Sequence, residues 1–215
     1  NDWYNKSTRN NMYCTQDNAM TTIGDTSTAG KMSPKNMLTT TFADELQLFN
    51  EAKVIGISLK DRGAILPAGH AGDAAYWMNA EGKWISSSYY MNELPEYIQK
   101  INEANTASSF LKGEWKVENE FTHNLSLMYA TSGGSAIKKT PFGNTILKDL
   151  AIKILRKEKL GQGNTTDILT ISFSSTDYIG HQYGPHAPEI KDTYIKLDED
   201  LAKLLKELEN NIGFE

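Results

Sequence analysis

Two short apolar runs, far apart in the chain, restrict the possible fold more than any other feature of this sequence. Residues 53–59 read Lys-Val-Ile-Gly-Ile-Ser-Leu, and residues 167–173 read Asp-Ile-Leu-Thr-Ile-Ser-Phe. Each run is too short for a helix and rich in β-branched residues, which is typical of strands buried on both faces of a parallel sheet. We therefore predict two buried strands of one sheet.

Apolar residues at helical spacing flank both runs. Ser33-Pro34 supplies a capping residue followed by a proline, and predicts a helix to about residue 50. The same device at Thr140-Pro141 predicts a helix to about residue 158, and regularly spaced apolar residues predict a long final helix over 190–208. Helices that alternate with strands in this way indicate an α/β fold with a parallel central sheet.

The remaining segments lack this alternation. Residues 1–32 are rich in Asn, Thr, Ser and Gly without a sustained period, which indicates irregular structure. From residue 63 to about 134, aromatic and polar residues alternate between Gly and Pro breaks, which predicts short antiparallel strands and one helix near 95–105. The predicted division is an α/β core over 1–62 and 141–215, interrupted by a mostly β, cap-like insertion over 63–140.

Composition limits the classes of function. The 215 residues are 39% hydrophobic and carry a net charge of -5, enough apolar material for a sizeable core. Without a block of Lys and Arg, nucleic-acid binding is not expected as the main task, and no apolar run approaches the roughly 20 residues of a membrane span. The single cysteine, Cys14, cannot form an internal disulfide and is interpreted as a structural thiol.

Several common enzyme signatures are missing from the sequence. It contains no Walker loop, no GxGxxG after a strand, no HExxH and no GxSxG. The chain begins Asn-Asp-Trp-Tyr rather than with Met, so we expect it to be a processed or trimmed piece.

Polar clusters follow both predicted strands, where ligands collect in open α/β sheets. Asp177 and His181, after the second strand, are four residues apart, so one helical turn would place a carboxylate and an imidazole on one face, within reach of one metal ion. Gly180 keeps the approach open, and Gly184-Pro185 turns the chain into the final helix. On spacing alone, a helix cap and a surface imidazole remain the alternative.

Lys60 and Arg62 follow the first strand. Alternate residues of an extended segment point the same way, so both cations are able to converge on one anion. Two solvated side chains neutralised by Asp61 between them are the alternative.

Longer motifs carry a resemblance to a known family. Asp177-Tyr-Ile-Gly-His181-Gln-Tyr-Gly-Pro185 resembles the metal-binding signature of the type I phosphodiesterase/nucleotide pyrophosphatase family of the alkaline phosphatase superfamily. Residues 58–70, 86–91 and 140–144 resemble, in the right order, the PafA-type bacterial alkaline phosphatases within it. The resemblance implies that the α/β core is part of an alkaline-phosphatase-like sandwich.

The resemblance also implies a reaction. Such enzymes use two zinc ions, and a Thr or Ser nucleophile that forms a covalent phospho-enzyme, which zinc-bound hydroxide then hydrolyses. Asp177 and His181 match two ligands of one zinc, Lys60 and Arg62 match the pair that binds phosphate oxygens, and Asn1 matches an asparagine that donates to a phosphoryl oxygen. The Lys-x-Arg pair favours a small-molecule phosphate monoester as substrate.

In the family, the nucleophile and one aspartate ligand precede the position of Asn1, and the remaining ligands follow that of Glu215. We therefore expect this chain alone to bind zinc weakly and to be inactive, although its parent is an enzyme, exported to the periplasm or secreted as its kin usually are. The sequence does not indicate an oligomeric state. Two alternatives remain: a nucleotide pyrophosphatase, or a non-catalytic α/β binding module whose insertion recognises a partner through Tyr76, Trp77, Trp84, Tyr89 and Tyr90.

Overall fold

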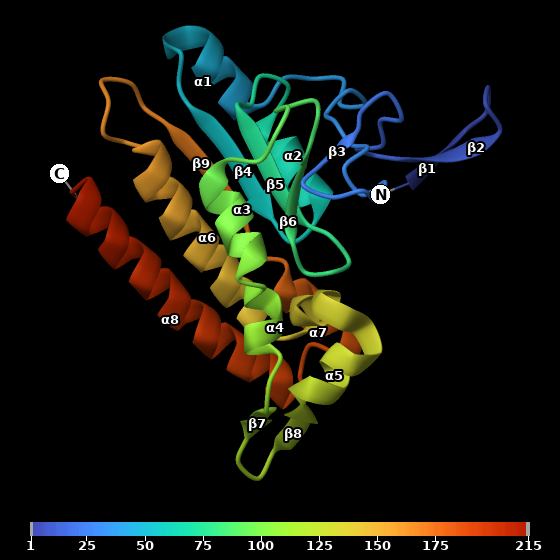
Figure 1. The fold of residues 1–215 in the computed structure, drawn as a ribbon, viewed down its shortest axis with the longest axis vertical. Helices are drawn as coiled ribbons and strands as arrows, with labels where there is room; N and C mark the ends of the chain where they lie inside the picture. The colour runs from blue at the N-terminus through green and yellow to red at the C-terminus, as the bar shows by residue number, and fades with distance from the viewer. Residues whose placement is uncertain (1, 214–215) are drawn as a thin grey trace.

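A mixed five-stranded sheet forms the centre of the computed structural model, which describes residues 2–213 (Figure 1). β4 (Val54–Ser58) pairs in parallel with β5 (Ala74–Met78) on one side and with β9 (Ile168–Ser172) on the other. β6 (Trp84–Ser87) and β3 (Thr22–Ile23) extend the sheet beyond β5 in antiparallel pairings. Both predicted strands are confirmed, but the sheet is mixed rather than parallel because β6 returns directly beside β5.

Helices cover both faces of this sheet. α2 (Asp61–Ala68) packs on one face, while α6 (Phe142–Glu158) packs on the other with α8 (Pro188–Asn211) beside it (Figure 1). The predicted helices over 140–158 and 190–208 are confirmed. β4 is fully buried, as predicted, whereas every residue of β9 is only half-buried, so the prediction of burial on both faces fails for that strand.

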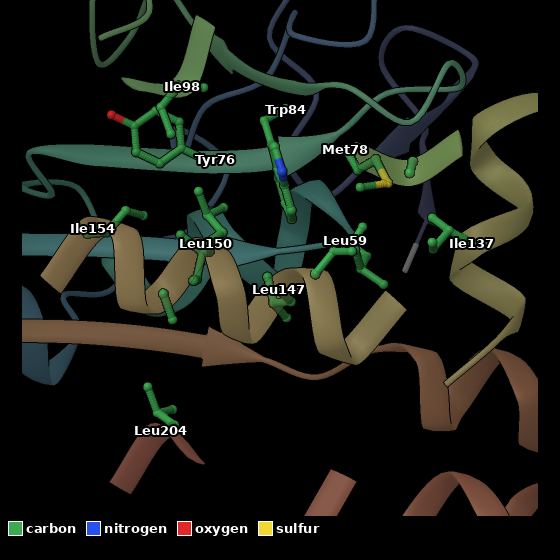
Figure 2. Packing of buried hydrophobic residues seen from close by; sticks show 14 of the residues in the cluster. Leu59, Tyr76, Met78, Trp84, Ile98, Ile137, Leu147, Leu150, Ile154 and Leu204 are labelled. Carbon is green, nitrogen blue, oxygen red and sulfur yellow. The ribbon is translucent and has the colours of Figure 1, made fainter. Parts of the chain in front are cut away.

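The largest apolar cluster lies between the sheet and α6. Successive strand residues point to opposite faces, so Ile55 and Ile57 of β4 enter this cluster while Val54 packs on Ala68 of α2. Figure 2 shows the residues of α6 that face the strands, namely Leu147, Leu150 and Ile154. Residues from other elements complete the cluster around them: Tyr76, Trp84, Ile98 and Leu204.

Gly56 sets how closely α2 approaches β4. A Cβ atom at this position would lie 2.1 Å from the backbone oxygen of Ala64, deep inside van der Waals contact. The glycine therefore allows the helix backbone to rest directly on the strand.

The segment 63–140 contains more helix than its aromatic alternation indicates. β5 and β6 belong to the central sheet, and the predicted helix is present as α3 (Glu96–Glu103). The rest gathers at one end of the molecule as one hairpin and further helices: β7 (Glu114–Val117), β8 (Phe121–Asn124), α4 (Thr106–Phe110), α5 (Leu125–Ser132) and the 3-10 helix η1 (Gly133–Lys139) (Figure 1). The division at residues 62 and 140 stays a prediction.

Two predictions for the first 50 residues are wrong. The helix expected from Ser33 begins only at Phe42, as α1 (Phe42–Asn50), because the Thr41 side chain and Asp44 form a reciprocal capping box there. The segment expected to be irregular contains β3 and a hairpin of β1 (Asp2–Asn5) and β2 (Asn10–Tyr13). The turn of this hairpin is held by Asn5, whose side chain accepts hydrogen bonds from two following backbone amides.

No helix within residues 2–213 has both the length and the apolar composition that crossing a bilayer requires.

Candidate active site at the carboxyl ends of β4 and β9

The polar residues after β4 and those after β9 lie at the same edge of the central sheet, where both strands have their carboxyl ends. Ser58, the last residue of β4, lies opposite Ser172, the last residue of β9, in the parallel register. α2 begins three residues after Ser58, and α7 (Ser175–Tyr183) begins three residues after Ser172. The segment that carries Asp177 and His181 is therefore a nine-residue helix.

Asp177 and His181 lie on one face of α7, one turn apart. Asp177 Oδ1 is 3.3 Å from His181 Nε2, and the imidazole is 81% exposed. α7 ends at Tyr183, and its C-cap Gly184 has a φ of +92°, in the region that favours glycine, before the chain turns into α8. The structure thus confirms the one-turn geometry that the spacing predicted.

Lys60 joins the basic pair to this helix. Its Nζ donates a hydrogen bond to Asp177 Oδ2 and lies 4.3 Å from the centre of the Tyr178 ring. The hydrogen bond from Lys60 holds the pKa of Asp177 below its ordinary value. A residue that follows one strand therefore meets a residue that follows the other, 117 positions away in the chain.

Lys60 and Arg62 are not arranged as predicted. Lys60 is the extended N-cap of α2, but Arg62 already belongs to the first turn of that helix, so the two do not alternate along a strand. Both still line the same hollow. The turn to helix right after β4 was missed because Gly63 and Pro67 argue against a helix over these residues.

Tyr13 connects Arg62 to its neighbour Asp61. The Tyr13 hydroxyl donates a hydrogen bond of 2.7 Å to Asp61 Oδ1 and accepts one of 3.0 Å from Arg62 Nη1. The Thr15 hydroxyl donates to Asp61 Oδ2 at 3.1 Å. Burial, aided by the bond to Asp61, raises the pKa of Tyr13, so the phenol stays protonated. Asp61 thus anchors the end of β2 and the residues that follow it, whereas the sequence suggested only that Asp61 neutralises its basic neighbours.

Three serines, Ser58, Ser172 and Ser174, interact with one another next to the first residues of α2 and α7. The Ser58 hydroxyl lies 3.0 Å from that of Ser174, 3.2 Å from the backbone oxygen of Ser172, and accepts a hydrogen bond of 3.1 Å from the backbone amide of Lys60. Ser58 is fully buried. These bonds tie the end of β4 to the end of β9 and so fix the separation of α2 and α7.

The basic pair opens onto a hollow of about 250 Å³. Three cationic side chains, one carboxylate and several aromatic and apolar side chains line it: Tyr13, Ala29, Met32, Leu59, Lys60, Asp61, Arg62, Trp77, Met78, Lys138 and Tyr178. This volume and charge suit a small anionic group.

The donors for a metal ion are fewer than a complete site requires. Within residues 2–213, no group of three or more His, Cys, Asp or Glu side chains converges to hold an ion. Asp177 and His181 have the oxygen and nitrogen chemistry that zinc takes, and fit two positions of such a site. Asn1, predicted to donate to a phosphoryl oxygen, lies outside the described residues.

Sequence reasoning missed Tyr13, Lys138 and Tyr178. Tyr178 could have been predicted, since it directly follows Asp177 in the sequence. Nothing in the sequence connects residues 13 or 138 with the strand ends. The partner-binding surface proposed for the binding module is wrong in its central part, because Tyr76, Trp77 and Trp84 are each only 2% exposed and belong to the core.

Comparison with known proteins decides the family. The model of the type I phosphodiesterase / nucleotide pyrophosphatase family matches residues 1–215. The chain belongs to this family.

The curated relatives of this chain include proteins from three bacteria. The chain is 40% identical to a Myroides odoratus protein named calcium-transporting ATPase, 36% identical to alkaline phosphatase PhoV of Synechococcus elongatus and 35% identical to alkaline phosphatase PafA of Elizabethkingia meningoseptica. Each match covers 99% of this chain and 44% of the relative, so the chain spans less than half of their length.

A solved structure shows the same fold. The crystal structure of wild-type alkaline phosphatase PafA matches with a TM-score of 0.94 and 36% identity, over 99% of this chain and 46% of that one. The fold is therefore the α/β architecture of the alkaline phosphatases, with a mixed central sheet.

Proposed function

We propose that this chain supplies the phosphate-binding cations and part of the metal site of a zinc-dependent phosphate monoesterase that works through a covalent phospho-Thr or phospho-Ser intermediate. The observation that carries the proposal is the contact between Lys60 and Asp177, which joins the basic pair to the candidate metal ligands at one sheet edge. The names of PhoV and PafA support hydrolysis of phosphate esters.

A second solved structure supports the assignment of the basic pair. It is a PafA variant in which a threonine is changed to serine, and an asparagine, a lysine and an arginine are each changed to alanine. The changed lysine and arginine are two positions apart in that protein, as Lys60 and Arg62 are here. On this basis we assign Lys60, Arg62 and Asn1 to the phosphoryl oxygens.

The roles follow from charge. In phosphoryl transfer, negative charge spreads over three equatorial oxygens, and cations already in place stabilise it without reorganising. Arg62 offers a planar pair of donors held by Tyr13, and Lys60 offers a point charge. Asp177 and His181 would hold the zinc ion, which would supply hydroxide at neutral pH. Lys60 donates to Asp177 in this structure, so if Asp177 held a metal ion, the ammonium group of Lys60 would be free to bind the phosphate.

The test uses the whole gene product that carries this chain, loaded with zinc. We expect it to hydrolyse an aryl phosphate monoester faster than an aryl methyl phosphate diester. Lys60→Ala and Arg62→Ala should each lower kcat/KM for the monoester by about 10²- to 10³-fold, the loss typical of one donor to a developing oxyanion. Lys112→Ala, at an exposed lysine away from the hollow, is the matched control.

ATP belongs in the same assay because the Myroides relative is named as an ATPase. A faster diester or ATP reaction would favour the nucleotide pyrophosphatase or another anhydride-cleaving activity. Absence of any zinc-dependent hydrolysis, together with unchanged phosphate binding in both alanine variants, would overturn the enzymatic proposal.

A further inference from the structure

Lys138 is a third cation in the hollow that holds Lys60 and Arg62. It reaches the hollow from η1, a segment distant in sequence from the ends of both β4 and β9. Its Nζ donates a hydrogen bond of 2.9 Å to the backbone oxygen of Met78, the last residue of β5. Across residues 2–213, no carboxylate lies within 4.0 Å of this ammonium group.

The surroundings of Lys138 favour an anion. Burial lowers its pKa to about 8, while Asp61 acts in the opposite direction and Lys60 adds to the lowering. A cation withdrawn from water without a paired carboxylate gains more from a bound anion than a solvated cation does. An anion between Lys60 and Arg62 would lie in the same hollow and supply the missing charge.

We propose that Lys138 is a binding residue for the doubly charged phosphate group, and that it makes the site favour dianions, namely inorganic phosphate and phosphate monoesters, over singly charged diesters. This inference rests on the proposed function, in which Lys60 and Arg62 bind the phosphoryl oxygens. A dianion differs from a diester by one negative charge, and a third cation is the group that discriminates between them.

A purely structural role makes a different prediction. The bond to Met78 connects η1 to β5, so its loss would reduce stability and affect all substrates alike. Discrimination between a dianion and a monoanion is a readout that such a role would not change.

The experiment compares Lys138→Gln and Lys138→Arg in the zinc-loaded whole gene product. The control is Lys139→Gln, which removes the same charge from an exposed neighbour. For Lys138→Gln we expect inhibition by inorganic phosphate to be about tenfold weaker. We also expect kcat/KM for an aryl phosphate monoester to fall about tenfold, whereas kcat/KM for the aryl methyl phosphate diester should fall at most about twofold. Lys138→Arg, which keeps the positive charge, should keep the preference for the monoester over the diester, and Lys139→Gln should stay close to the wild type.

A pH series adds an independent readout. Lys138 binds an anion only while protonated, so the phosphate affinity it provides is present below about pH 8 and is lost as the pH rises above that value. Lys138→Arg should retain this affinity at pH 9.5, because arginine stays charged. The groups that share the hollow, Lys60, Asp61, Arg62, Tyr13 and Tyr178, are the same in both proteins, so the difference reports on residue 138.

Equal losses for monoester and diester, no loss in Lys138→Gln, or the same loss in Lys139→Gln would each overturn the inference. If Lys138→Gln does not fold, the pH comparison of Lys138→Arg with wild type decides. Calorimetric binding of inorganic phosphate separates the two proposals. A protein without hydrolysis but with weakened phosphate binding in Lys138→Gln contradicts the proposed function alone, and an active protein with unchanged binding contradicts the inference alone.

Discussion

At the scale of single residues, the arrangement of Arg62 depends on a tyrosine from another part of the chain. The Tyr13 hydroxyl accepts from Arg62 and donates to Asp61, which places the guanidinium relative to the start of α2. We therefore expect Tyr13→Phe to lower kcat/KM for a phosphate monoester by about tenfold, the effect of one well-placed hydrogen bond to a charged group. Steady-state kinetics of the whole gene product measures the change.

A double-mutant cycle separates positioning from general destabilisation. If Tyr13 acts through Arg62, its removal should cost little in an Arg62→Ala background, so the two losses should not add. Tyr194→Phe, at an exposed tyrosine of α8, is the control and should leave kcat/KM unchanged. Fully additive losses would show that Tyr13 acts by another route.

At the scale of elements, the contact between β4 and α2 positions both cations. Gly56→Ala would place a methyl group 2.1 Å from the Ala64 backbone oxygen, and only a movement of α2 relative to β4 relieves that overlap. We expect the free energy of unfolding to fall by about 1–3 kcal/mol, as for other overpacked cores, and monoester activity to fall with it because Arg62 lies in α2 and Lys60 is its N-cap.

Gly163→Ala is the matched control for this substitution. The nearest atom to a Cβ at residue 163 is 4.0 Å away, so the new methyl group meets open space. Thermal unfolding and monoester kinetics of both variants test the argument. A Gly56→Ala protein with wild-type stability and activity would show that α2 adapts without moving its first turn.

Elements whose own sequence repeats a clear period were predictable. The apolar stripe of α6 and the β-branched run of β4 specify their structures locally, and both were predicted with nearly correct bounds. α2 was missed because Gly63 and Pro67 lower its intrinsic helix propensity, and packing on β4 and β5 overrides that preference. The β1–β2 hairpin was missed because its strands are largely exposed and lack apolar alternation.

The candidate site shows the same limit. Asp177 and His181 share one helix, so their relation follows from spacing alone, and the structure confirms it. The contacts of Lys60 with Asp177 and of Tyr13 with Asp61 join residues far apart in the chain. Such contacts follow from the sheet order and from the path of the first 15 residues, which no local pattern encodes.

At the scale of the whole molecule, the number of metal donors sets the zinc affinity. Asp177 and His181 supply two donors, Asp177 is already paired with Lys60, and His181 is largely exposed. A catalytic zinc usually has three protein ligands. We therefore expect residues 1–215, expressed alone and shown to be folded by circular dichroism, to bind zinc much more weakly than the whole gene product does, as measured by competition with a chromophoric chelator.

Two variants of the 215-residue chain show whether the predicted donors provide this weak binding. His181→Ala should abolish it, because one carboxylate remains. Lys60→Ala should strengthen it, because the ammonium that competes for Asp177 and repels a cation is removed. Zinc affinity equal to that of the whole gene product, or binding unaffected by His181→Ala, would place the metal elsewhere. We expect these opposite responses if Asp177 alternates between Lys60 and the metal ion, which is also how Lys60 would become available to phosphate.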